Sequence, residues 1–251
     1  MDPTIVAIIV LILLVAAILI GRGLRRLLPG HHLNEETKDT VKLAMGLVAT
    51  MAALLLGLLV SSAKGSYDAD RTQVIQMAAK VSYVDRLLAL YGPESMDARK
   101  QFHVAIEDAI RRVWPKDKGS KAELRPSIEA GDSVYLKIEA LSPNTDAQRK
   151  LKTLVEAGAA DLAQLRALLV AHSGTSISTP MLVVLVSWLV VIFASFSLLA
   201  PQNMTANVAL YVSALAVAGA VFLLLELDSP FNGILKIPNR EMVNALNQLP
   251  K

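Results

Sequence analysis

Long apolar runs without a single charged residue constrain this chain more than any other feature of its sequence. The longest lies between His172 and Glu226. A helix needs about 20 apolar residues to cross a hydrocarbon core of about 30 Å, so this run is too long for one crossing. The sequence at 201–203, Pro-Gln-Asn, divides it into 180–200 and 205–225. We therefore predict two membrane-crossing helices joined by a tight turn.

Two further runs lie near the N-terminus, at 4–21 and 43–63. Basic residues border them: Arg22, Arg25, Arg26, Lys42 and Lys64. Over the whole chain 53% of residues are hydrophobic, 19% are charged and the mean hydropathy is +0.46. A soluble domain of this composition would not gather its apolar residues into such runs. We predict an all-α membrane protein with four transmembrane helices.

Composition also narrows the possible functions. The formal net charge is only +3, which gives no support to nucleic-acid binding. There is no cysteine, so disulfides, thiolate metal sites and cysteine nucleophiles are excluded. Asp2, rather than a basic residue, precedes the first apolar run, and no small-residue cleavage site follows it. We therefore expect the first helix to stay in the protein rather than to serve as a cleaved signal.

The residues between the second and third runs have the pattern of a helical domain outside the membrane. Apolar residues at intervals of three and four predict a helix over 72–91, which Gly92-Pro93 should end. Further helices are expected over 94–114, over 127–141 and from Pro143 onward, with a charged loop at 116–125. The predicted division is a first helix pair (1–63), a helical extramembrane domain (64–179), a second hairpin (180–227) and a C-terminal tail (228–251).

Small residues recur at helical spacing on two of the predicted spans. They are Gly46, Thr50, Ala53, Gly57 and Ser61 on the second, and Ala209, Ser213, Ala216 and Ala220 on the fourth. Small side chains let helix backbones approach closely in lipid, which favours helix association. Small residues are also simply common in membrane helices, so the pattern fits either an interface or ordinary composition.

Few residues in the sequence suggest a catalytic site, and we expect no enzyme activity, no cofactor and no metal site. His103 and Glu107 are one helical turn apart, which fits half a metal site but more often a surface pair. His31-His32 lies in a polar loop where neighbouring side chains diverge. The third span contains Ser187, Ser195 and Ser197, whose hydroxyls we expect to bond back to their own helix.

The segment after the fourth span carries a resemblance to a known family. Glu226 and Asp228 lie four and two residues before Pro230-Phe231, which resembles the motif that ends the last membrane helix of bestrophins. Leu56-Gly57-Leu58 resembles a step in the bestrophin pore helix. The chain as a whole is similar to the bestrophin-like domain of unknown function, a family of bacterial and plant membrane proteins. Segments that carry this similarity are Ser66-Tyr67-Asp68, Leu88 to Pro93 and Ala200-Pro201-Gln202-Asn203.

The resemblance to bestrophins implies a pentamer around a central ion pore lined by the second helix of each subunit. Matched on Gly57, the hydrophobic neck positions fall on Thr50, Leu54 and Leu58. These residues are four apart, so each can form a ring around the pore axis. The alternative is that Leu54 and Leu58 face lipid or a neighbouring helix.

Two departures from bestrophins bear on the site. Asn232-Gly233-Ile234-Leu235-Lys236 follows the Pro-Phe pair, where animal bestrophins carry further acidic calcium ligands, so we expect no calcium site of that kind. Ala63-Lys64-Gly65 stands where bestrophins have bulky aromatic residues. For Glu226 two interpretations remain: a residue that shapes the helix end before Pro230, or a carboxylate that pairs with a cation or lines a vestibule.

The sequence thus favours an oligomeric ion channel, with anion selectivity implied by the bestrophin resemblance. The alternative is a non-conducting scaffold or sensor whose helical domain binds a partner. Expected partners are membrane lipid, inorganic ions and further copies of the chain. We expect a multi-pass protein of the bacterial inner membrane, with the domain and both termini cytoplasmic, although the basic loop 22–42 argues for the opposite orientation.

Overall fold

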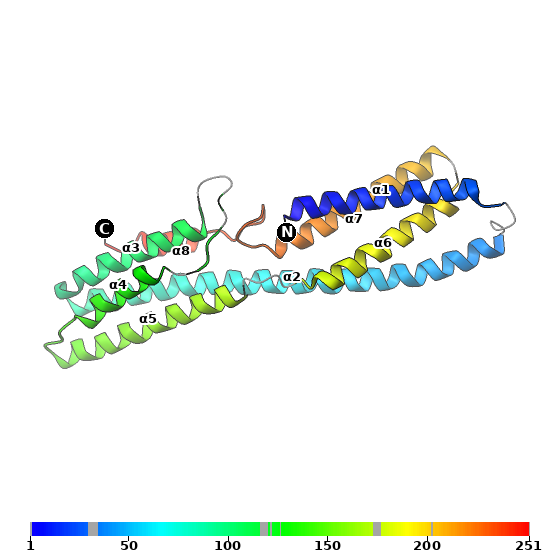
Figure 1. Cartoon of the computed structure of the whole chain (residues 1–251). Coiled ribbons are helices and arrows are strands. Elements are labelled where there is room, and N and C mark those ends of the chain that lie inside the picture. The colour runs from blue at the N-terminus through cyan, green and yellow to red at the C-terminus, as the bar shows by residue number, and fades with distance from the viewer. Residues whose placement is uncertain are drawn as a thin grey trace. The chain divides into compact units, whose positions relative to one another are not determined.

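The computed structural model of the chain describes residues 2–29, 35–115, 120, 122–125, 127–172, 177–201 and 203–250. Within these ranges the structure is helical, with one short 3₁₀ helix and no β-strand (Figure 1). Four of the helices are long and apolar enough to cross a membrane, as the sequence predicts. His31 and His32 lie outside the described residues, as do Gln202 and parts of the loop 116–125.

The chain forms two compact units. The first, called the span unit below, consists of Met1–Ser66 and Thr175–Ser229. The second, called the helical unit, consists of Tyr67–Gly174 and Pro230–Lys251. The four-part division into membrane and extramembrane regions stays a prediction, because compactness alone does not say which residues lie in lipid.

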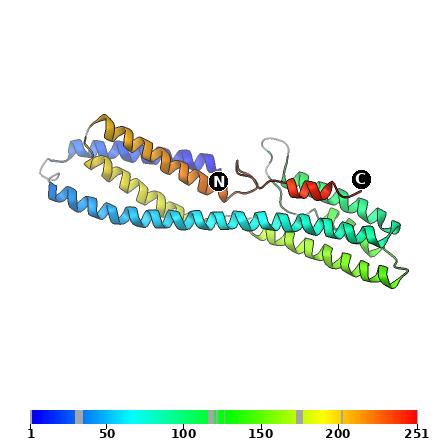
Figure 2. The same cartoon turned by 180° about the vertical axis from the view of Figure 1, so that it is seen from behind.

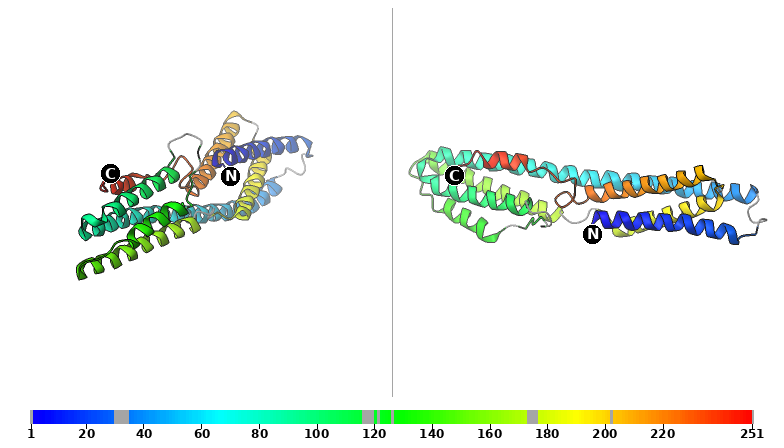
Figure 3. Two further views of the ribbon diagram at one scale, coloured as in Figure 1. Left: turned by 60° about the vertical axis from the view of Figure 1, so that its left-hand side comes forward. Right: turned by 90° about the horizontal axis from the view of Figure 1, so that it is seen from above.

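Three helices of the span unit pack side by side: α1 (Pro3–Leu27), α6 (Thr179–Leu199) and α7 (Met204–Leu227), as Figures 1 and 3 show. Their contacts bury a core of fully enclosed aliphatic side chains: Leu14, Ile18, Leu185, Val221 and Leu224. Side-chain caps begin two of these helices. Asp2 accepts a hydrogen bond from the Thr4 amide at 3.0 Å, and Asn203 accepts one from Ala206 at 2.8 Å.

The second predicted span is part of a much longer helix, α2 (Glu35–Tyr91, 57 residues). The predicted span over 43–63 and the predicted helix over 72–91 are joined in this one helix. Between them Gly65 is a single glycine without a proline, and one glycine costs about 1 kcal/mol, too little to end a helix. The chain does reverse at Gly92, whose φ of +123° is accessible mainly to glycine, and Pro93 follows. The predicted end of the helix at Gly92-Pro93 is confirmed.

In the helical unit, the end of α2 is followed by the 3₁₀ turn η2 (Pro93–Ser95) and by α3 (Met96–Val113), α4 (Ile128–Glu139) and α5 (Asp146–His172). The predicted helices over 94–114 and 127–141 agree with α3 and α4 to within about two residues. The predicted fourth helix is α5, which starts three residues after Pro143. Ser127 caps α4 by accepting a hydrogen bond from the Ala130 amide at 3.3 Å.

The C-terminal residues belong to the core of the helical unit rather than forming an independent tail. A short helix, α8 (Arg240–Leu246), lies beside α3 in Figure 2. Five apolar side chains of this segment are buried in the core: Phe231, Ile237, Met242, Ala245 and Leu249. The segment 230–251 is therefore a structural part of this unit.

Candidate functional site

The predicted pore-lining residues lie together on one uncovered face of α2. Thr50 is exposed, and Leu54 and Leu58 are 71% and 61% exposed. Ala52 and Leu59 point to the other side of the helix and are buried in the core of the span unit. With about 100° of rotation per residue, steps of four turn the face by only about 40°, so the three predicted positions form one stripe.

The small residues predicted on the second span lie on the same face of α2. A Cβ atom added at Gly46 or at Gly57 would meet no other atom within 4 Å. Ala53 and Ser61 are exposed as well. The Thr50 hydroxyl donates to the carbonyl oxygen of Gly46 at 2.9 Å, so it bonds back to its own helix. Within the described part of the chain, this face of α2, called the open face below, has no helix against its glycines.

Of the four small residues predicted on the fourth span, three are exposed and Ala220 is partly buried. Ala209, Ser213 and Ala216 are exposed on α7. The buried side of α7 carries a different set, Ala214, Ala218, Val221 and Leu224. Both sets recur at intervals of three and four residues, and nothing in the sequence separates them, because apolar α7 has almost no difference in hydrophobicity around its circumference.

The helices α1 and α6 approach each other closely at Gly21. A Cβ atom added at Gly21 would overlap the carbonyl oxygen of Ala194 and lie 3.0 Å from the Cβ of Ser197. The Ser197 hydroxyl donates to the carbonyl oxygen of Ile18 at 2.6 Å. The prediction that the serines of this span bond to their own helix is therefore wrong for Ser197, although Ser187 does donate to Val184 at 2.7 Å. Hydroxyls that bond across helices help to fix membrane helix pairs.

Two arginines at the end of α1 fasten this helix to the first turns of α7 and to the end of α6. Arg22 donates to the amide oxygen of Asn207 at 2.7 Å and to the hydroxyl of Tyr211 at 3.4 Å, and its guanidinium lies 5.3 Å from the centre of that ring. Arg25 donates to the carbonyl oxygen of Ala200, which ends α6. The sequence identified these residues only as charges that border a span. Their partners lie about 180 positions away, which no local pattern reveals.

The acidic Pro-Phe motif divides between the two units. In the span unit, Glu226 lies in the last turn of α7 with 2% exposure, and the backbone of Asp228 caps that helix. Glu226 is therefore enclosed within the chain, which supports a role at the helix end and gives no support to a vestibule lining. Both acidic residues have interaction partners.

In the helical unit, the rest of the motif anchors the C-terminal segment. The carbonyl oxygen of Pro230 accepts a hydrogen bond from the Ile237 amide at 2.8 Å. Phe231 is 3% exposed and packs edge to face on Trp114, with ring centres 6.1 Å apart. The Trp114 indole also donates to the Ile237 carbonyl at 2.8 Å. The aromatic half of the motif thus has a clear packing role in this unit.

The predicted metal and catalytic candidates are not brought together. Within the described ranges, no group of three or more His, Asp or Glu side chains is placed to hold a metal ion. His103 and Glu107 lie one turn apart on α3, and both are partly exposed. No hydrogen bond or ion pair joins these two side chains.

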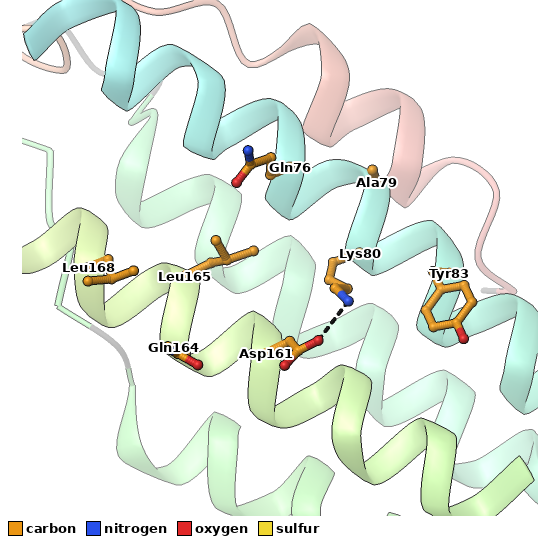
Figure 4. Close-up of a pocket in the computed structure, with 8 residues that line it drawn as sticks. All are labelled: Gln76, Ala79, Lys80, Tyr83, Asp161, Gln164, Leu165 and Leu168. Carbon is orange, nitrogen blue, oxygen red and sulfur yellow. Dashed lines mark hydrogen bonds and ion pairs between the residues drawn. The ribbon is translucent and has the colours of Figure 1, made fainter. Parts of the chain in front are cut away.

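A groove on the helical unit was not predicted from the sequence. It has a volume of about 640 Å³ and lies between the second part of α2 and α5 (Figure 4). Lys80 and Asp161 pair across it at 2.7 Å, and the Lys80 ammonium lies 5.6 Å from the centre of the Tyr83 ring. Gln76, Ala79, Gln164, Leu165 and Leu168 complete its lining. Such a groove between helices can receive a peptide or a neighbouring helix.

Fold and sites together define an all-helical protein with four helices able to cross a membrane and a second, discontinuous helical unit. The model of the bestrophin-like domain family matches residues 12–242, nearly the whole chain. The chain belongs to the bestrophin-like family. No curated protein and no solved structure matches it significantly.

Proposed function

We propose that the chain is one subunit of a homo-oligomeric ion channel whose pore is lined by the open face of α2. The observation that carries this proposal is that face itself: Thr50, Leu54 and Leu58 are exposed beside uncovered glycines, on a helix long enough to cross the membrane. Membership of the bestrophin-like family supports it. By analogy with bestrophins, the assembly is a pentamer and the preferred ions are anions.

The chemistry of the open face suits a hydrophobic gate. Side chains four residues apart on a helix are separated by about 6 Å along its axis, so the three positions would form three stacked rings. Rings of leucine give an ion nothing to replace its hydration shell, and a narrow ring of this kind excludes water and closes the pore. The Thr50 ring would present its methyl groups and hydroxyl oxygens at one end of this constriction.

Small residues on the open face supply the contact between subunits. Gly46, Ala53 and Gly57 lie along one edge of the leucine stripe and allow close approach of a second helix. The mass of the purified protein in mild detergent tests this part of the proposal. A pentamer is expected, and a monodisperse monomer would contradict it.

Conduction is tested with Leu54→Ala/Leu58→Ala in reconstituted liposomes. Because exclusion of water depends steeply on pore radius, the double variant should raise anion flux and weaken selectivity. Leu215→Ala/Leu223→Ala on α7 is the matched control, since these leucines are also exposed on a span. Unchanged flux in an assembled Leu54/Leu58 variant, with wild-type flux measurable, would remove these residues from the pore.

A second function is favoured by the groove between α2 and α5. In a non-conducting scaffold or sensor, this groove would bind a partner and the spans would serve as anchor. Lys80→Ala removes the ion pair to Asp161 and one of the side chains that line the groove. Its effect separates the two proposals: a scaffold loses partner binding, whereas a channel keeps its flux. Absence of flux from the wild-type protein in every lipid and salt condition would place the scaffold first.

We also propose that the helical unit and both termini face the cytoplasm of a bacterial cell, by analogy with bestrophins. Cysteines introduced at Ser120 and Thr37, both exposed, can be labelled in intact cells with an impermeant reagent. Labelling at position 37 and not at 120 is expected. Labelling at 120 and not at 37 would reverse the orientation.

A further inference from the structure

The outer face of α1 is a continuous apolar surface that ends in a basic residue. Ile12 and Leu19 are 61% and 54% exposed, and Arg26 is exposed as well. These residues are seven apart, which is close to two helical turns, so they lie in one line along the helix. The opposite side of α1 carries Leu14 and Ile18, which are buried against α6 and α7. The exposed line therefore faces the surroundings of the span unit.

Arg26 differs from its two basic neighbours in its contacts. Arg22 bonds to Asn207 and Tyr211, and Arg25 bonds to the Ala200 carbonyl. Among the described residues Arg26 has no hydrogen bond and no ion pair. The donors of its guanidinium are therefore not used by any residue that the structure describes.

The charge around Arg26 favours an anion. No charged residue occurs in α6 or in the first turns of α7. The cations between residues 22 and 42 are Arg22, Arg25, Arg26, Lys38 and Lys42, and the carboxylates are Glu35, Glu36 and Asp39. Glu35 pairs with Lys38 at 2.8 Å and Asp39 pairs with Lys42 at 2.9 Å. This end of the span unit, where α1 ends and α2 begins in Figure 1, therefore keeps a net positive charge.

We infer that the end of α1 is a binding site for an anionic phospholipid, whose phosphate contacts Arg26 and whose acyl chain lies along Leu19. The dimensions agree with this assignment. One leaflet contributes about 15 Å of hydrocarbon, which equals about ten helical residues. Counted back from Arg26, ten residues reach Ala16, so Leu19 lies within the same leaflet, whereas Ile12 lies beyond the middle of the bilayer. The inference requires only that the chain lies in a membrane and is independent of ion conduction.

Native mass spectrometry of the detergent-solubilised protein tests the site. The protein is titrated with dioleoylphosphatidylglycerol and, separately, with dioleoylphosphatidylcholine, which has the same chains and no net charge. Wild type should bind the anionic lipid more tightly. One arginine near a membrane surface contributes about 1 kcal/mol with anionic lipid, so Arg26→Gln should weaken phosphatidylglycerol binding about fivefold. Its binding of phosphatidylcholine should not change, which also reports that the variant is folded.

Two control variants separate the site from general charge. Arg86→Gln removes an exposed positive charge from the helical unit and should leave both lipid affinities unchanged. Arg26→Lys should keep most of the preference for phosphatidylglycerol, because the charge remains. Equal phosphatidylglycerol binding by wild type and Arg26→Gln would overturn the inference. Loss of bound phosphatidylglycerol on addition of millimolar inorganic phosphate would also overturn it, by showing a phosphate site that needs no acyl chain.

Discussion

Two glycines on α1 should respond in opposite directions to the same substitution. Gly21 and Gly23 are two residues apart near the end of the helix. A Cβ atom at Gly21 would overlap the Ala194 carbonyl of α6, whereas one at Gly23 would meet nothing within 4 Å. Alanine is the better helix former by up to about 1 kcal/mol at either position. The difference between Gly21→Ala and Gly23→Ala therefore isolates the steric cost of separating α1 from α6.

The size of that cost follows from the packing. Inserting a methyl group into a well-packed contact costs about 1 to 3 kcal/mol, because backbones must shift. Here the obstacle is a backbone oxygen of a helix that is also bonded to α1 through Ser197 and Ile18, so neither partner moves freely. We expect Gly21→Ala to be less stable than Gly23→Ala by about 1 to 3 kcal/mol. Gly23→Ala itself should equal or exceed the wild type.

The assay is unfolding of the purified protein in mixed micelles as the fraction of sodium dodecyl sulfate increases, followed by circular dichroism. Hydrogen exchange of peptides from α1 and α6 locates the effect, since only Gly21→Ala should speed exchange at this contact. If Gly21→Ala proves as stable as Gly23→Ala, α1 and α6 do not meet at Gly21 and the proposed packing of the span unit is wrong.

Four other predictions follow from single contacts. Ser197→Ala removes the hydrogen bond to Ile18 and should cost about 0.6 kcal/mol in the same unfolding assay, whereas Ser187→Ala, whose hydroxyl bonds to its own helix, should change stability less. Asp85 accepts two hydrogen bonds from Arg99, at 2.8 and 2.9 Å, and these raise the pKa of that arginine. Asp85→Ala should lower the free energy of unfolding by about 2 kcal/mol. In a double-mutant cycle with Arg99→Ala the two effects should be coupled rather than additive. Phe231→Ala should cost about 3 kcal/mol and alter Trp114 fluorescence, while Ile234→Ala, at an exposed position nearby, should do neither. Burial, aided by the charge of Glu94, raises the pKa of the Tyr91 phenol, and its hydroxyl has no hydrogen-bond partner among the described residues. Tyr91→Phe should therefore stabilise the protein by about 1 kcal/mol near neutral pH. Above about pH 10 the phenol ionises first in the unfolded state, so the wild type should lose further stability there and the variant should not.

The sequence predicted the helices well because their signals are local. Uncharged runs give the four spans, and Gly92-Pro93 gives the end of α2. The structure joins the second span and the helix over 72–91 in one helix, because the change from apolar to polar composition between them requires no break in the backbone. The more polar composition at 64–71 indicates a change in the environment of the helix. Only glycine or proline in sufficient number would indicate an interruption of its backbone.

The contacts that hold the candidate site could be predicted only in part. The stripe of Thr50, Leu54 and Leu58 follows from helical periodicity, and its exposure agrees with either a pore or lipid. Arg22 with Asn207, and Ser197 with Ile18, join residues far apart in the chain, so one sequence gives no indication of them. The groove at Lys80 and Asp161 is hidden for the same reason, since its two walls are 81 positions apart.

The order in which the chain is synthesised has a consequence for the helical unit. This unit takes its first part from Tyr67–Gly174 and its last from Pro230–Lys251, with α6 and α7 made in between. Until the chain beyond α7 has been synthesised, Phe231 and Ile237 are missing from this unit. Trp114 and its apolar neighbours, which pack against them in the finished protein, remain uncovered until then. Partly made chains expose apolar surface of this kind to aggregation. The unit can therefore close its core only after α6 and α7 have been made, and a delay in their insertion would hold it in an unfinished state.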